Sequence, residues 1–198
     1  VDVARAVCER IYGTDVQVTF VGVSGETRES MLETGVIDAL ISCYTITDER
    51  AQTYNLSVPY YMEQTKVMVK KDSGITSIAD MDGMTVGVLG ASTNAQGLLE
   101  YASDHSVTIF ASGYDTFMQA KDGLLNGIID GFSADGVVLK GYLDDSCLIL
   151  PDGFSPQEYG IVTRKDDTEL AASIDDAIAA MEQDGTLSDL QEKWGIAS

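Results

Sequence analysis

Apolar positions follow two spacings along the chain, one typical of helices and one typical of strands. Between residues 3 and 11 they recur at every third or fourth position, which predicts a helix that ends at Gly13. Between residues 16 and 20 they occupy every second position, which predicts a strand. The same reasoning predicts helices at residues 29–34, 47–54, 78–81, 94–102, 116–125, 137–143 and 170–181, and strands at residues 35–41, 67–69, 85–89, 128–132 and 160–163. Strands that alternate with helices indicate an α/β fold with largely parallel pairing.

Two segments of the chain repeat one local pattern. Residues 31–40 and 124–132 each contain the apolar end of a helix, a glycine, and then Ile-Asp in a short apolar run. A helix that ends at glycine and leads into a strand is common, so chance could produce one such pair. Both copies also lead into a polar helix start, and we therefore favour two lobes of similar construction.

Length and composition narrow the class of protein. The 198 residues suffice for one large domain or two smaller lobes, and 44% of them are hydrophobic. A net charge of −20 argues against a nucleic-acid partner and is typical of a solvated acidic surface. No apolar run reaches the roughly 18–20 residues that a membrane-spanning helix needs. Cys8, Cys43 and Cys147 have no C-x-x-C spacing and form no disulfide framework. One disulfide with one free thiol is a possible arrangement, and the sequence does not indicate which two cysteines would pair.

The first of three strand-to-helix junctions is "LISCYTITDERA", at residues 40–51. Thr47 suits a helix N-cap, and Asp48 and Glu49 complement the positive end of the helix. Arg50 lies in the same turn, where a cation is mildly unfavourable. It could simply pair with a neighbouring carboxylate at the surface. Alternatively, it could hold an anion as a bidentate clamp, together with the hydroxyl of Thr45.

The second junction is "VGVLGASTNAQG", at residues 86–97. Gly90-Ala91 makes the turn, and the four residues from Thr93 to Gln96 fit a capping box. Capping is one interpretation of this junction, and a second set of donors for the same anion is the other. The segment has no Walker lysine and no G-x-G-x-x-G pattern, which disfavours nucleotide binding.

The third junction is "IIDGFSADGVVLKG", at residues 128–141. Asp135 stands where an N-cap belongs, and capping is the usual role of such an aspartate. If its side chain faces a ligand instead, it supplies a carboxylate for a cation. Taken together, the three junctions offer a clamp for a carboxylate and a partner for an ammonium group. An α-amino acid carries both groups.

Longer motifs resemble the type 3 extracellular solute-binding proteins that serve polar amino-acid ABC transporters. The motifs are "GVIDALISCYTITDERAQTYNLSVPYY", "KKDSGITSIADMDGMTVGVLGAST", "YGIVTRKDDTEL" and "DGTLSDLQEKWGI", and the resemblance covers nearly the whole chain. It implies a two-lobed periplasmic-binding-protein-like fold of type II, in which each lobe is a mostly parallel sheet flanked by helices. Two hinge strands near residues 65–67 and 160–163 would join the lobes. Lobe one is then residues 1–66 and 164–198, and lobe two is residues 67–163.

The resemblance also implies a set of ligand-binding residues. Arg50, Thr45 and Thr93 would bind the α-carboxylate, with Ser92 beside them. Asp135 would accept the α-ammonium. The backbone at Cys43, which replaces the usual Gly or Ser, would assist Asp135.

The sequence departs from the family at its start and near the ligand side chain. The family begins with a further strand and loop before the first helix, and we expect that this piece and any signal segment are absent from the chain. Gly25 stands where many members have an aromatic residue. Arg28 matches an arginine that dicarboxylate-binding and amide-binding members direct at the ligand side chain. It could instead pair with Glu26 at the start of a helix.

These observations define the expected function. We expect an extracytoplasmic amino-acid-binding component of an ABC transporter, periplasmic or lipid-anchored, that captures a Glu-, Gln- or Asp-like ligand by closure of two lobes. It would act as a monomer with the permease as its partner, and it would use no cofactor and no metal. A sensor domain of a membrane receptor is one alternative. A dehydratase-type enzyme on the same fold is another, although His105 has no evident nucleophile beside it.

Overall fold

The computed structural model describes residues 1–90 and 92–196, and the chain divides into two compact units. Unit 1 consists of Val1–Met62 and Glu158–Ser198, and unit 2 of Glu63–Gln157. The division falls inside strand β3 (Tyr61–Lys70) and inside strand β8 (Phe154–Tyr159). Both points lie several residues before the expected hinge positions. The turn expected at Gly90-Ala91 includes Ala91, which lies outside the described residues.

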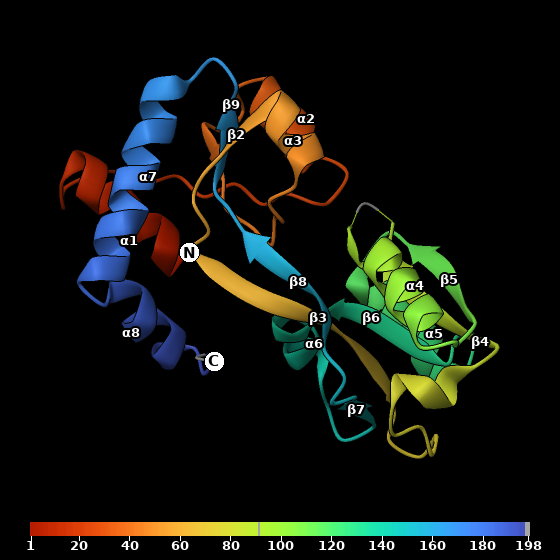
Figure 1. The fold of residues 1–198 in the computed structure, drawn as a ribbon. Helices are drawn as coiled ribbons and strands as arrows, with labels where there is room; N and C mark the ends of the chain where they lie inside the picture. The colour runs from red at the N-terminus through yellow and green to blue at the C-terminus, as the bar shows by residue number, and fades with distance from the viewer. Residues whose placement is uncertain (91, 197–198) are drawn as a thin grey trace. The chain divides into compact units, whose positions relative to one another are not determined.

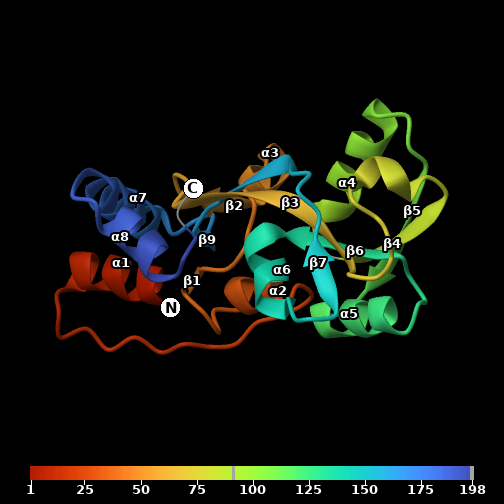
Figure 2. The ribbon, with the colours of Figure 1, turned by 90° about the horizontal axis from the view of Figure 1, so that it is seen from below.

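Unit 1 has a three-stranded sheet in the order β1-β9-β2, with helices packed against it. Helices α1, α7 and α8 lie together on one side (Figures 1 and 2) and share a core around Val7, Ile178 and Met181. A second core contains Leu32 and Tyr44. The elements are α1 (Asp2–Tyr12), α2 (Arg28–Glu33), β1 (Ala39–Leu40), α3 (Asp48–Thr53), β2 (Tyr54–Leu56), β9 (Val162–Arg164), α7 (Thr168–Gln183) and α8 (Thr186–Lys193).

Unit 2 has a larger sheet in the order β5-β4-β6-β3-β7, with β8 pairing with β3. Val67 and Val69 of β3 belong to one hydrophobic core and Met68 belongs to another, because successive side chains of a strand point to opposite faces. Helices α4 and α5 cover these two faces (Figure 2). The elements are η1 (Ile78–Met81), β4 (Met84–Leu89), α4 (Asn94–Asp104), β5 (Ile109–Tyr114), α5 (Phe117–Leu125), β6 (Gly131–Asp135), α6 (Gly136–Tyr142) and β7 (Cys147–Ile149).

The repeated sequence pattern corresponds to two similar helix ends. Gly35 follows α2 with φ of 72°, and Gly127 follows α5 with φ of 71°. In both copies the next two N–H groups turn back to one carbonyl, that of Met31 after α2 and that of Gly123 after α5. A positive φ carries no steric cost for glycine, which explains why this residue recurs.

The expectation of largely parallel sheets is wrong for most of the pairings. In unit 2, β4 pairs in parallel with β5 and β6, whereas β3 runs antiparallel to β6 and β7. In unit 1, β9 runs antiparallel to both β1 and β2. The reason is connectivity, because β3 contains one of the points where the chain passes between the units, and β9 follows the other. The alternation of strands and helices does not reveal the direction of such returning strands.

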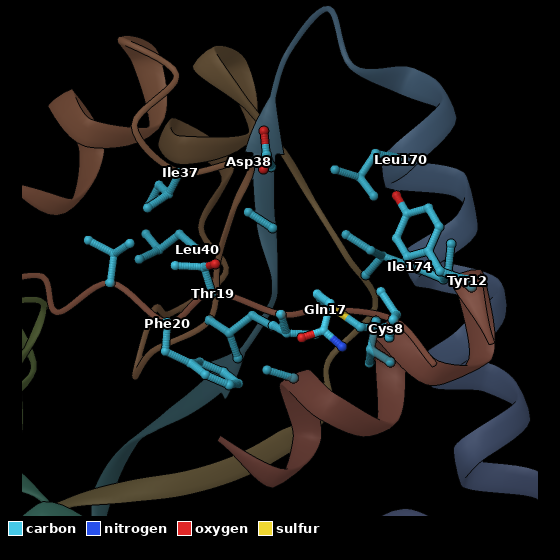
Figure 3. Close-up of a pocket in the computed structure, with 18 of the residues that line it drawn as sticks. Cys8, Tyr12, Gln17, Thr19, Phe20, Ile37, Asp38, Leu40, Leu170 and Ile174 are labelled. Carbon is cyan, nitrogen blue, oxygen red and sulfur yellow. The ribbon is translucent and has the colours of Figure 1, made fainter. Parts of the chain in front are cut away.

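The strand expected at residues 16–20 does not form, and the buried strand expected at residues 35–41 is reduced to Ala39–Leu40. A cavity of about 1010 Å³ is lined by residues 16–23 on one side and by residues 36–41 on another (Figure 3). The cavity therefore separates the two segments, and no described part of the chain pairs with residues 16–20 as a strand. Alternating side chains alone cannot make a strand, because its backbone groups need partners.

The strand expected at residues 128–132 begins three residues later than predicted, at Gly131. Ile128 and Ile129 still belong to the turn that follows α5, where their N–H groups bond to the carbonyl of Gly123. The strand consequently extends to Asp135, and all of its residues are buried. This shift places Asp135 at the end of β6 and directly before α6.

Candidate functional site

In unit 1, the guanidinium of Arg50 is held in one position by two contacts. Arg50 lies in the first turn of α3, where its backbone N–H donates to the hydroxyl of the N-cap Thr47 over 3.2 Å, as expected. Its Nη1 donates to the carbonyl of Thr45 over 2.7 Å, and its Cζ lies 3.9 Å from the ring centroid of Tyr44. An arginine placed in this way is preorganised to accept a carboxylate in bidentate fashion.

The ring of Tyr44 makes cation–π contacts with two arginines. Its side chain is fully buried, and its hydroxyl donates to a carboxylate oxygen of Glu29 over 2.8 Å. Burial and the bond to Glu29 raise the pKa of Tyr44 to about 12, so the phenol stays neutral. The Cζ of Arg28 lies 4.6 Å from the same ring centroid. Burial and the nearby Arg50 lower the pKa of Arg28. The ring therefore brings two guanidinium groups close together.

The two remaining predicted residues of unit 1 adjoin this cluster in sequence. Thr45 is 9% exposed, and its backbone forms an antiparallel bridge with Tyr159. Cys43 is exposed and forms no disulfide. Cys8 and Cys147 form none either, so the three cysteines make no disulfide pair.

In unit 2, the start of α4 does not form the expected capping box. Thr93 has helical dihedral angles (φ −77°, ψ −10°) and makes no side-chain cap bond. Its hydroxyl instead donates to Oε1 of Gln157 over 2.6 Å. The hydroxyl of Ser92 donates to the carbonyl of Leu89 over 2.8 Å, which stabilises the turn. The capping prediction failed because the Thr93 hydroxyl bonds to the side-chain amide of Gln157, which lies 64 positions away and is not part of the local pattern.

Asp135 lies at the N-cap position of α6 but makes no side-chain cap hydrogen bond to that helix. It is 7% exposed, and its Oδ1 accepts a hydrogen bond of 2.7 Å from Nδ2 of Asn94. The usual capping role of such an aspartate is thus not observed here. A buried carboxylate that is held by a hydrogen bond can bind a cation with high directionality.

The structure brings the predicted residues together within each unit and adds two that sequence reasoning missed. Arg50, Thr45 and Arg28 gather around Tyr44 in unit 1. Asn94 connects to Asp135 in unit 2. Tyr44 gave no local signal beyond its place in a polar turn, and Asn94 was assigned only to the start of a helix.

The cavity of unit 1 is not a suitable site for a zwitterion. The described residues that line it include Asp38, Asp167 and Glu169 but no arginine or lysine, and none of the predicted ligand-binding residues. Ile37, Leu40, Leu170 and Ile174 supply much of its apolar wall (Figure 3). A free carboxylate there would meet carboxylates rather than a cation.

The described residues contain neither a helix suited to cross a membrane nor a metal-binding cluster. No helix among residues 1–90 and 92–196 is long and apolar enough to cross a membrane. The same part of the chain contains no group of three or more His, Cys, Asp or Glu side chains that could hold a metal ion.

Known proteins resemble this chain along its length. The sequence profile of the bacterial extracellular solute-binding proteins, family 3, matches residues 1–197. The chain belongs to this family. The glutamine-binding protein GlnH of Bacillus subtilis is 30% identical over 98% of the chain and 71% of its own length. The L-cystine-binding protein TcyJ of Escherichia coli is 33% identical over 82% of the chain, and the match spans 62% of its own length.

A solved member of this fold confirms the expected architecture. An ancestral arginine-binding protein bound to glutamine superimposes with a TM-score of 0.84 at 30% identity, covering 98% of this chain and 86% of that one. The predicted two-lobed α/β fold of solute-binding proteins is therefore correct, with mixed rather than mostly parallel sheets.

Proposed function

We propose that this solute-binding chain is the amino-acid-binding component of an ABC transporter and that the permease of that transporter is its partner. The family to which it belongs is extracellular, so the chain acts outside the cytoplasm. It is a binding protein rather than an enzyme, in line with the names of its relatives. The observation that carries the proposal is the Arg50 guanidinium, which is fixed between the Tyr44 ring and the Thr45 carbonyl.

Each unit supplies the chemistry for one end of an amino acid. Arg50 of unit 1 binds the α-carboxylate through two parallel N–H···O bonds, because its fork already has the required orientation. Asp135 of unit 2 binds the α-ammonium, because its carboxylate is buried and is not engaged in capping α6. The other proposed ligand-binding groups are Thr45 and the backbone at Cys43 in unit 1, and Ser92 and Thr93 in unit 2.

Arg28 defines the ligand class within this function. It contacts the same ring as Arg50, so a second cation lies beside the one that takes the carboxylate. Two neighbouring guanidinium groups attract an acidic or amide side chain and repel a basic one. The ligand is therefore glutamate, glutamine or aspartate rather than arginine or lysine. The name of the Bacillus relative, a glutamine-binding protein, supports this class.

A thermal-shift screen with the common amino acids, followed by isothermal titration calorimetry, tests both proposals. A ligand at about a thousandfold excess over Kd should stabilise the fold by about 4 kcal/mol. We expect a rise in Tm with glutamate, glutamine or aspartate and none with arginine or lysine. A flat response to every amino acid would contradict the function.

The ligand class has its own variant test. Arg28→Ala should weaken glutamate binding, whereas Arg5→Ala should not. Arg5 also lies over an aromatic ring in unit 1, that of Phe20 at 5.0 Å, but belongs to no predicted site. Unchanged glutamate affinity in Arg28→Ala would remove the assignment of the ligand class and leave the amino-acid function standing.

A further inference from the structure

The side chain of Asp135 is oriented by its surroundings rather than by its own helix. It ends β6, and in the antiparallel ladder with β3 it lies opposite Thr65, which is fully buried. An aspartate at this position would ordinarily turn toward the N–H groups of α6. Since that bond is not made, another group must hold the carboxylate in the rotamer that is observed.

Asn94 is one such group. It is the first residue of α4 and is 4% exposed. Its amide nitrogen lies 2.7 Å from Oδ1 of Asp135 and 3.0 Å from Oγ1 of Thr65. An amide NH₂ group has two hydrogens, and these two acceptors use both of them. The amide plane of Asn94 is therefore fixed, and with it the position of one oxygen of the Asp135 carboxylate.

We propose that Asn94 is a positioning residue for recognition of the ligand ammonium. This inference rests on the proposed function, in which Asp135 binds that group. A hydrogen bond from a neutral amide favours the ionised carboxylate and fixes its direction without cancelling its charge. Lysine or arginine in the same place would hold the carboxylate equally well but would compete with the ligand for its negative charge. An uncharged donor therefore suits a site whose own ligand brings the cation.

The experiment compares ligands that differ only in the α-amino group. Isothermal titration calorimetry is performed with glutamine and with glutaramate, which is glutamine without its amino group, and with glutamate and glutarate as a second pair. For each protein, the Kd of the deamino compound divided by the Kd of the matching amino acid measures recognition of the ammonium. We expect Asn94→Ala to reduce this ratio by about tenfold, through weaker binding of the amino acid, because a hydrogen bond to a charged group is lost. The Kd of the deamino compound should stay unchanged.

A second variant and a control keep the test independent of folding. Asn94→Ser retains a residue that is suited to a helix start, but its side chain is too short to replace the amide, so the ratio should fall as in Asn94→Ala. Asn126→Ala removes another amide of unit 2, which donates to the carbonyl of Asp122 at the end of α5, and should leave both Kd values unaltered. Circular dichroism confirms that each variant is folded.

The outcomes separate this inference from the function on which it rests. If the unmodified protein binds none of the common amino acids, the proposed function fails and the inference fails with it. If it binds them, and the Asn94 variants weaken both members of a pair by the same factor, Asn94 has only a structural role. An unchanged ratio in folded variants would likewise overturn the inference while leaving the amino-acid function intact.

Discussion

Replacement of Arg50 offers the most direct test of how this protein binds its ligand. The side chain makes two contacts within unit 1, a hydrogen bond of 2.7 Å to the Thr45 carbonyl and a cation–π contact at 3.9 Å with Tyr44. Arg50→Ala removes both contacts together with the proposed bidentate bond to the ligand. Arg50→Lys keeps the charge but loses the planar fork.

The expected magnitudes follow from these contacts. Loss of one partner of a desolvated, hydrogen-bonded charge pair costs about 2–4 kcal/mol of binding free energy, which raises Kd by about 30-fold to 1000-fold in Arg50→Ala. Arg50→Lys should lose one charge-assisted bond to the ligand, which raises Kd by about tenfold. The free energy of unfolding should fall by only about 1–3 kcal/mol, from the cation–π contact and the bond to Thr45. Binding should therefore be lost while the fold persists.

Calorimetric titration with glutamate and glutamine measures the first effect, and thermal denaturation followed by circular dichroism measures the second. Arg5→Ala is the matched control, because Arg5 contacts the ring of Phe20 in the same unit. It should lose some stability and no affinity. A folded Arg50→Ala protein with a Kd within about threefold of the unmodified protein would refute the assignment of Arg50 to the ligand carboxylate.

Three further predictions concern stability. In Gly97→Ala, the new methyl group would clash with Oγ and Cβ of Ser155, so the unfolding free energy measured with urea should fall by about 1–3 kcal/mol. Equal urea midpoints for the variant and the unmodified protein would contradict this close approach. Leu139→Ala leaves a cavity at a fully buried position in the core of unit 2, so the unfolding free energy should fall by about 2–5 kcal/mol in the same assay. A fall of less than about 1 kcal/mol would show that the site is loosely packed. Hydrogen bonds from Thr186 and the Arg10 guanidinium lower the pKa of Asp184 to about 2. The stability that these bonds contribute is therefore present above the unfolded pKa of about 4 and is lost as the pH falls toward about 2. Asp184→Asn should accordingly make the Tm less dependent on pH between these two values.

Local sequence patterns determined those parts of the structure whose hydrogen bonds close within a few residues. The spacing of Ile174, Ile178 and Met181 predicted the buried face of α7 correctly, because an α-helix repeats every 3.6 residues wherever it lies. Gly35 and Gly127 marked two helix ends for a similar reason, since only the backbone of the same turn is involved. The resemblance of longer motifs to a known family added the two-lobed fold and the candidate residues.

The tertiary structure alone decided where the polar side chains point. The bond from Asn94 to Asp135 spans 41 positions and exists only because the sheet brings the end of β6 close to the start of α4. Local spacing favoured a cap for both Thr93 and Asp135, and in each case a distant partner determined the orientation instead. The contacts of Tyr44 with Arg28 and Arg50 arose in the same way. A side chain can form a hydrogen bond with any suitable group within about 3 Å. The order of the strands in the sheet, rather than the order of residues in the sequence, determines which groups lie that close.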